Sequence, residues 1–134
     1  MAFERVDGYR TIEFGTPGTS RDTILNFLFN GNKRATAGLL EHDYRAEGEA
    51  IEHIGEVLVV LGNENEPLGK IQATRVDIVR FDEVSDEFAL AEAEGDLTGD
   101  DFRKSHREFW EGCGYEVKPE SMVVCMYFDL IEKY

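Results

Sequence analysis

Apolar residues recur along the chain at the spacings of both helices and strands. One predicted helical face carries three apolar residues, Ile24, Leu25 and Leu28. Thr19 with Asp22 three residues later resembles a capping box, and Asn30-Gly31 is a typical helix end. We therefore predict a short helix between these signals. The apolar positions over 35–44 indicate a second short helix, although an extended conformation is the alternative at its start.

A longer helix is predicted in the second half of the chain, behind a cap formed by Thr98 and Asp101. Its apolar stripe has the spacing i, i+4, i+7, i+8 and i+11 and consists of Phe102, His106, Phe109, Trp110 and Cys113. Such a stripe is typical of a face packed against the core. A shorter helix is predicted over 82–91.

The remaining segments have the patterns of strands. A continuous apolar run over 56–61 is typical of a buried central strand, and a turn-rich connection separates it from a long strand over 68–81. Apolar residues occupy both faces of a last strand that starts near 122, and 9–15 is a short strand or extended arm. Because strands and helices do not alternate as βαβ repeats, we expect an α+β fold with a mainly antiparallel, barrel-like sheet.

Length and charge narrow the classes of partner. The 134 residues fit a single domain over 1–134, with 1–18 as an N-terminal arm or short strand. Acidic residues number 28 against 14 Lys and Arg, which gives a net charge of −14. This charge repels a phosphate backbone and disfavours extended nucleic-acid binding, but it leaves a nucleoside or a short single-stranded RNA element as partners.

The chain carries no apolar run of membrane-span length and no signal-like start, so we expect a cytoplasmic protein without a membrane partner. The three histidines have no ligand-type spacing with one another or with the two cysteines. We therefore expect no metal site and no cofactor. The oligomeric state is not indicated.

The clearest candidate for a polar site is the segment Gly31-Asn32-Lys33-Arg34-Ala35-Thr36, combined with an acid from the later run 92–96. If 33–36 forms a helical turn, Lys33 and Thr36 share one face, whereas in an extended segment they point to opposite sides. A threonine hydroxyl needs a base to become a nucleophile, and a desolvated lysine can be that base. A carboxylic acid can protonate a leaving amine. Lys33, Thr36 and Glu94 are thus a complete set for amide hydrolysis.

Each of these residues also has a structural interpretation. Lys33 can complement a helix dipole, Thr36 can cap a helix, and Glu94 can belong to a solvated acidic face. Further candidates for ligand binding are Tyr44, by stacking on a base, and the basic residues Arg75 and Arg103, by contact with a phosphate.

In the order of its motifs the chain resembles the ASCH domain family from about residue 24 to its end. The shared motifs are Gly31-x-Lys33-x-x-Thr36-Ala37, Glu47-Gly48-Glu49, Phe81-Asp82-Glu83-Val84, Phe88-Ala89, Glu94-Gly95-Asp96, Phe102-Arg103, His106 and Val124-Cys125. The resemblance implies a PUA-like β-barrel flanked by short helices, a fold shared with RNA-binding modules. The chain departs from the family at Ala93, where a glycine is common, at Phe102, usually a tryptophan, and at Gly55-Glu56, where Gly-Asp is common.

The resemblance implies three alternatives for function. The first is a binding module with a cleft for a nucleoside or a short RNA element. The second is an amidohydrolase on an acylated nucleoside. Acetylcytidine amidohydrolases resemble this family and use a Lys-x-x-Thr pair and a later Glu, which places the base on Lys33, the nucleophile on Thr36 and the proton donor on Glu94. The third is a weak ribonuclease, which the net charge disfavours.

Overall fold

The structure, a computed structural model, describes residues 5–134, so the first four residues of the expected N-terminal arm lie outside the described residues. Its strands are β1 (Arg5–Val6), β2 (Tyr9–Ile12), β3 (Ala35–Leu39), β4 (Val57–Leu61), β5 (Pro67–Arg80) and β6 (Met122–Lys133). Its α-helices are α1 (Thr19–Phe29), α2 (Asp86–Glu92) and α3 (Gly99–Gly112). A π-helical turn at Leu40–Arg45 follows β3, and a 3₁₀ turn at Phe81–Glu83 follows β5. The class is α+β, as predicted.

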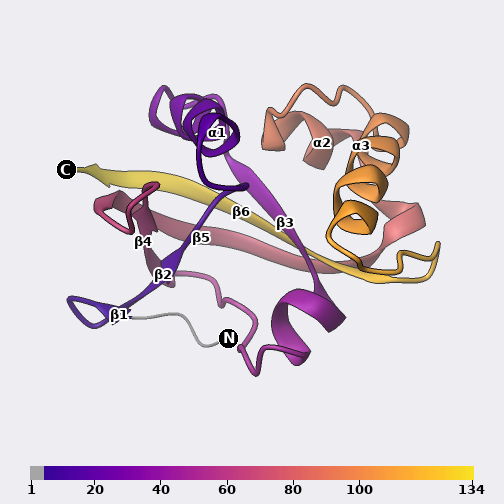
Figure 1. Ribbon diagram of the computed structural model, residues 1–134, viewed down its shortest axis with the longest axis horizontal. Coiled ribbons are helices and arrows are strands. Elements are labelled where there is room, and N and C mark those ends of the chain that lie inside the picture. The colour runs from indigo at the N-terminus through magenta and orange to yellow at the C-terminus, as the bar shows by residue number, and fades with distance from the viewer. Residues whose placement is uncertain (1–4) are drawn as a thin grey trace.

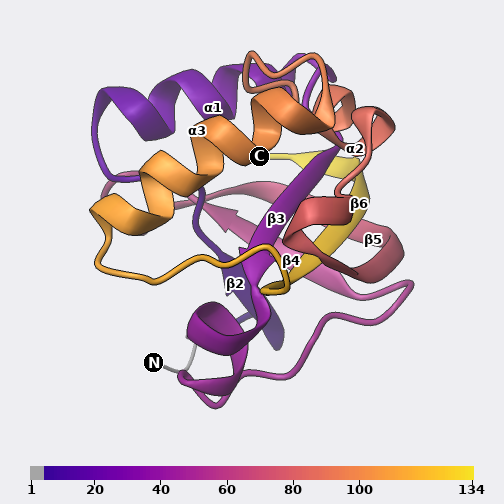
Figure 2. The ribbon, with the colours of Figure 1, turned by 90° about the vertical axis from the view of Figure 1, so that its right-hand side faces the viewer.

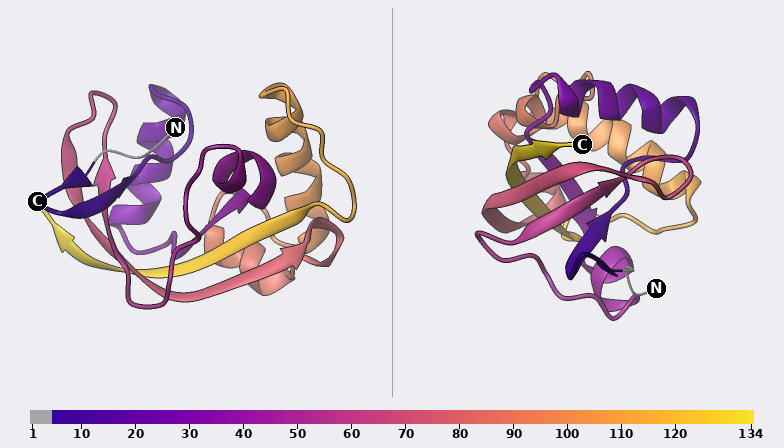
Figure 3. Two further views of the ribbon diagram at one scale, coloured as in Figure 1. Left: turned by 90° about the horizontal axis from the view of Figure 1, so that it is seen from below. Right: turned by 90° about the vertical axis from the view of Figure 1, so that its left-hand side faces the viewer.

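The six strands form one mixed sheet in the order β1-β2-β4-β5-β6-β3. The long strands β5 and β6 pair along most of their lengths, and all neighbours are antiparallel except β2 and β4, which are parallel. The three α-helices lie on the same side of the β5–β6 pair (Figure 1). Seen from below, the long strands bend towards these helices (Figure 3).

The expected closed barrel is wrong, because over residues 5–134 strands β1 and β3 form two separate edges of an open sheet. The edge of β3 is blocked at both ends. Asp43 Oδ2 accepts a hydrogen bond from the backbone N–H of Leu39 at 2.8 Å, and the N–H of Arg34 donates to the carbonyl of Ala91 at 2.8 Å. These contacts occupy groups that a further strand would need.

The expected second short helix over 35–44 is also wrong at its start, where the extended alternative is confirmed. Residues 35–39 form β3, which pairs with β6 in the register Ala35↔Tyr127 to Leu39↔Val123. Helical structure begins only at Leu40. Pairing with a long strand thus overrides the local apolar spacing that favoured a helix.

The helix signals are partly confirmed. Thr98 caps α3, since its side chain accepts a hydrogen bond from the N–H of Asp101 at 3.1 Å, and α1 ends at Asn30 as predicted. The capping box at Thr19 is wrong, because Gly18 is the N-cap residue and no side chain caps the helix.

Two apolar clusters flank β3 and position the helices. One packs α2 and α3 on the sheet and includes Phe81, Phe88, Phe102, Trp110 and Val123. The other packs α1 on the sheet and includes Phe14, Leu25, Leu28, Ile71 and Phe128. As a result α1 and α3 both lie above β3 in Figure 2, and Figure 1 shows them on opposite sides of that strand. None of the helices within the described range is both long enough and apolar enough for a membrane span.

Candidate functional site

A cavity of about 480 Å³ lies over β3, between α1 and α3. Thr36, Ala37 and Gly38 of β3 contribute to its wall, and aromatic side chains of α3 and of the segments around it contribute the apolar part. Six carboxylates line it, those of Glu13, Asp43, Glu52, Glu92, Glu94 and Asp96. The described residues that line the cavity include neither a lysine nor an arginine. Among the described lining residues acidic side chains therefore predominate, with His106 as a basic side chain beside them.

The turn between α1 and β3 buries Lys33 directly behind this wall. Gly31 has φ of 88°, which suits glycine, and the N–H of Lys33 donates to the carbonyl of Phe27 at 2.9 Å. The ammonium Nζ of Lys33 lies 2.6 Å from Glu94 Oε2, 3.1 Å from the carbonyl oxygen of Glu92 and 3.8 Å from Glu92 Oε2. Lys33 itself is 1% exposed. Its charge is therefore satisfied by acceptors at the end of α2 and in the connection that follows it.

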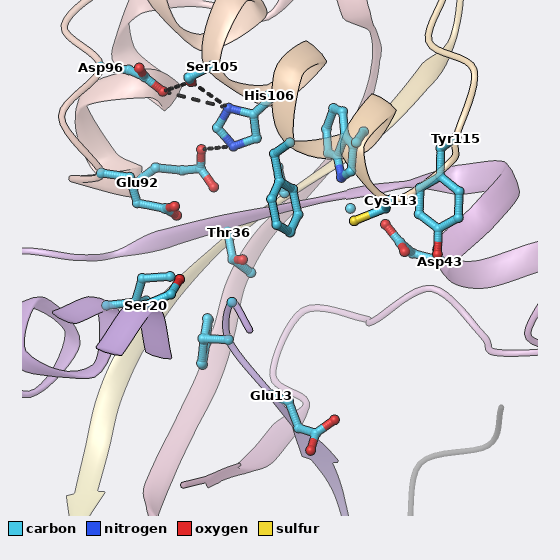
Figure 4. A pocket seen from close by; sticks show the side chains of 18 of the residues that line it. Glu13, Ser20, Thr36, Asp43, Glu92, Asp96, Ser105, His106, Cys113 and Tyr115 are labelled. Atoms are coloured by element: carbon cyan, nitrogen blue, oxygen red, sulfur yellow. Dashed lines mark hydrogen bonds and ion pairs between the residues drawn. The ribbon is translucent and has the colours of Figure 1, made fainter. Parts of the chain in front are cut away.

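The acidic run after α2 is folded so that alternate residues reach the cavity. Ala93 caps α2 in the left-handed conformation with φ of 53°, and Gly95 has φ of 98°. These two residues reverse the backbone, so Glu92, Glu94 and Asp96 all line the cavity. Figure 4 shows the carboxyl groups of Glu92 and Asp96 on either side of the His106 ring.

Glu92 and His106 form a second charged contact. Glu92 Oε1 lies 3.0 Å from His106 Nε2, but the ring N–H is not aligned with this oxygen, so the contact is an ion pair rather than a well-directed hydrogen bond. Burial raises the pKa of the Glu92 carboxyl, against the opposing effects of His106 and Lys33. This carboxyl is 2% exposed and borders the cavity.

His106 is held by acceptors on both sides of its ring. Nδ1 lies 3.1 Å from the carbonyl oxygen of Phe102 and 3.6 Å from Asp96 Oδ2, and the ring stacks on Phe102. Burial alone would lower the pKa of His106, but the contact with Glu92 and the charges of Glu94 and Asp96 outweigh it and raise the pKa. Acceptors at both nitrogens favour the doubly protonated ring.

Two buried arginines support the cavity wall from behind. Arg21 donates from Nε to the carbonyl of Phe14 at 2.9 Å, which fixes the segment between β2 and α1. Arg10 donates to the carbonyl of Ala50 at 2.7 Å and pairs with Glu52, which in turn accepts a hydrogen bond from the hydroxyl of Tyr44 at 2.7 Å. Both guanidinium groups are thus structural.

The structure brings together part of the predicted site. Lys33 and Glu94 are in direct contact, Thr36 and Glu94 line the same cavity, and Tyr44 lines it as well. Lys33 stands behind the wall rather than in it. The catalytic roles of Lys33, Thr36 and Glu94 stay predictions.

Arg75 and Arg103 do not belong to the cavity lining. Arg75 lies on β5, 57% exposed, and pairs with Asp77 and Glu87. Arg103 bonds the carbonyl of Val84 and the carboxylate of Asp100. Their roles as ligand contacts stay predictions for a ligand that extends beyond the cavity.

Sequence reasoning missed Glu92, Asp96 and His106 as members of the site. The apolar stripe on α3 pointed to core packing, and Phe102 and Trp110 are indeed buried, but His106, Phe109, Trp110 and Cys113 also line the cavity. The alternation of acids at 92, 94 and 96 was a usable signal. Over residues 5–134 no group of three or more His, Cys, Asp or Glu has the arrangement of a metal site.

Comparisons with known proteins agree on one family. The sequence pattern of the ASCH domain matches residues 10–132. A crystal structure of an ASCH domain from Lactobacillus crispatus JV V101 superposes with a TM-score of 0.76 at 25% identity, over 92% of this chain and 82% of that one. Protein EF3133 from Enterococcus faecalis V583 superposes with a TM-score of 0.77 at 25% identity, over 92% of this chain and 77% of that one.

A more distant structure shares the fold alone. The hypothetical protein PH0355 superposes with a TM-score of 0.57 at 16% identity, over 90% of this chain and 100% of that one. The comparison with curated proteins gives no match.

Proposed function

Because the chain belongs to the ASCH domain family, we propose that its cavity is a binding site for an uncharged ligand of nucleoside size. The observation that carries this proposal is the lining of six carboxylates without a lysine or arginine among the described lining residues. Carboxylates accept hydrogen bonds from amino groups and repel phosphates. We also propose that the fold is PUA-like, as the motifs imply, and so is related to that of RNA-binding modules.

Size and shape support a nucleoside rather than a longer RNA. A volume of about 480 Å³ is within the range of small-molecule sites. Phe109, Trp110 and Tyr115 give the cavity an aromatic side on which a base can stack. A short RNA element would place phosphates next to the acidic lining, so it fits only if a single base enters and the backbone stays outside.

The binding test uses the fluorescence of Trp110, the one tryptophan of the sequence and a lining residue. Titration with cytidine should change the emission and saturate. Cytidine 5′-monophosphate should bind at least about tenfold more weakly, because its phosphate meets the carboxylates. Equal or tighter binding of the monophosphate, or of a short single-stranded RNA, would contradict the proposal.

Two variants on α1 make a matched control for this titration. Ser20 lines the cavity, whereas the neighbouring Thr23 is exposed and does not line it. Ser20→Phe should abolish nucleoside binding by filling the space, and Thr23→Phe should leave it unchanged. If both variants bind alike, the nucleoside is not in this cavity.

Hydrolysis of an amide on the same ligand is the second candidate, and the 2.6 Å contact between Lys33 Nζ and Glu94 Oε2 favours it. A contact this short gives a direct path for a proton to pass from Lys33 to Glu94 during the reaction. With this proton on Glu94, Lys33 is neutral and serves as the base for the Thr36 hydroxyl once a bound ligand draws Thr36 Oγ within hydrogen-bond distance of Nζ. The acidic lining gives no comparable support to the ribonuclease alternative.

In the proposed reaction the amide is hydrolysed in two stages, through an ester on Thr36. Thr36 Oγ attacks the acyl carbon and its proton passes to Lys33, then the C–N bond breaks while Glu94 protonates the leaving nitrogen. The amine departs and the acyl group remains as an ester on Thr36. Water then attacks this ester and gives a proton to Glu94. The carboxylic acid leaves, and the threonine oxygen recovers its proton from Lys33.

The hydrolysis test measures acetate release from acetylcytidine. Thr36→Val, Lys33→Met and Glu94→Gln should each reduce kcat by about a thousandfold or more, while Thr74→Val, on an exposed position of β5, should leave it unchanged. Activity that survives in Thr36→Val and Lys33→Met would remove the assigned roles while leaving the binding proposal standing.

A further inference from the structure

The backbone of β3 offers the cavity a hydrogen-bond donor in addition to the side chains that line it. β3 pairs with β6 on one side only, so its other edge is not part of a ladder. Thr36, Ala37 and Gly38 of this strand all line the cavity. Backbone groups on the outer edge are therefore placed to meet a ligand.

The register of the ladder decides which backbone groups point outward. In an antiparallel pair, alternate residues direct both their N–H and C=O groups to the neighbouring strand. The N–H of Phe128 donates to the carbonyl of Arg34 at 2.9 Å, and Thr36 is opposite Met126. Thr36 and Gly38 therefore point to β6, as the carbonyl of Arg34 does, and the alternate residues Ala35, Ala37 and Leu39 point away from it.

An independent contact supports this assignment. The N–H of Leu39 donates to Asp43 Oδ2 at 2.8 Å, which requires that it point away from β6. The N–H of Ala37, two residues earlier, has the same direction. Outside the β3–β6 ladder no acceptor is found for the N–H of Ala37 among residues 5–134.

The open part of this edge is short. Asp43 occupies it at Leu39, and the N–H of Arg34 is bonded to the carbonyl of Ala91 at the other end. A peptide strand would need several consecutive groups along an edge. The free donor at Ala37 therefore suits a single carbonyl oxygen of a small ligand rather than an added strand.

We propose that the backbone N–H of Ala37 binds the carbonyl oxygen of the ligand's acyl group and stabilises its negative charge when Thr36 Oγ attacks. This inference rests on the proposed amide hydrolysis. The donor directly follows the proposed nucleophile in the chain, an arrangement that other hydrolases use for an oxyanion hole. In this step the C–O bond to Thr36 forms and the carbonyl electron pair moves to the oxygen that Ala37 holds. The ligand is thus an N-acylated nucleoside with a small acyl group.

A nuclear magnetic resonance titration tests the contact without turnover. In ¹⁵N-labelled Thr36→Ala protein, acetylcytidine should shift the amide proton of Ala37 downfield, and cytidine, which lacks the acyl group, should not. The amide of Gly38 points to β6 and is the internal control. If acetylcytidine shifts resonances around the cavity but leaves that of Ala37 in place, this inference is wrong, while the proposed binding of a nucleoside in the cavity is supported.

Removal of the donor tests its role in the reaction. Replacement of the Ala37 amide by an ester, through incorporation of lactic acid at position 37, deletes one N–H and keeps the side chain. It should lower kcat for acetylcytidine by about a hundredfold, with the affinity for cytidine unchanged. Unchanged kcat would overturn the inference. No binding of either nucleoside to the unmodified protein would overturn the proposed function itself.

Discussion

Lys33 Nζ and Glu94 Oε2 lie 2.6 Å apart, although 61 residues separate the two in the sequence. The lysine side chain is fully buried, whereas the glutamate side chain is 29% exposed. Lys33 is therefore fixed, whereas Glu94 borders the cavity and can turn towards a ligand. A ligand that bonds Glu94 would change the environment of Lys33 without contacting it.

The first prediction concerns the stability that this pair provides. Lys33→Met should lower the free energy of unfolding by about 3 kcal/mol, because it removes the ammonium that pairs with Glu94 and leaves the buried carboxyl of Glu92 with His106 as its remaining cationic partner. Urea denaturation at neutral pH measures the loss. The exposed Lys104 is the control, and Lys104→Met should change the free energy by less than about 0.5 kcal/mol.

The second prediction concerns pH. The folded-state pKa of His106 is raised above its usual value near 6.5, so the stability from its protonation is complete below pH 6.5 and is lost as pH rises through the raised pKa. Glu92 acts in the same direction but from a lower pH, because its folded-state pKa is raised from the usual 4.5 of a glutamate. The free energy of unfolding should therefore fall as pH rises above 6.5.

Urea denaturation across this pH range checks the expectation. The double variant Glu92→Gln with His106→Gln should show a smaller fall, while His53→Gln, at a side chain that is 77% exposed, should keep the fall of the unmodified protein. An equal fall in the double variant would show that other groups are responsible.

The third prediction concerns the backbone at the end of α2. Ala93 has φ of 53°, a conformation that disfavours residues with a Cβ by about 1 kcal/mol. Ala93→Gly should therefore raise the free energy of unfolding by about that amount. Gly95 has φ of 98°, and Gly95→Ala should lower it. Thermal unfolding of the two variants should show opposite shifts in Tm.

The fourth prediction concerns the two arginines outside the cavity. Arg75→Gln and Arg103→Gln should leave the Kd for cytidine within about twofold, because neither side chain lines the cavity. Either change should lower the affinity for a short RNA whose phosphates reach the surface. This loss of affinity should be smaller at high salt. A large loss of cytidine affinity in Arg103→Gln would place the ligand elsewhere.

The sequence was sufficient for most elements but not for the sheet. The α1 and α3 helices and the strands β4, β5 and β6 follow from local spacing and turn residues. The conformation of 35–39 depends on pairing with β6, a long-range contact that local patterns do not contain. The open sheet has the same origin, since the groups that block β3 come from Asp43 and Ala91.

The candidate site was predictable to a similar degree. The order of the motifs identified Lys33, Thr36 and Glu94, because residue types and their spacing can be read directly from the sequence. The contact between Glu92 and His106 depends on how two left-handed residues turn the chain after α2. The outward direction of Ala37 depends on strand register. Neither property can be read from residue types alone.

The pairing of β3 with β6 has a consequence for protein synthesis. The ladder partner of the segment that carries Thr36 and Ala37 is β6, which leaves the ribosome after all the other described elements. Until then the nascent β3 edge has no partner, and the wall of the cavity cannot be complete. Competence for ligand should therefore emerge in a single late step, after the helices have already formed.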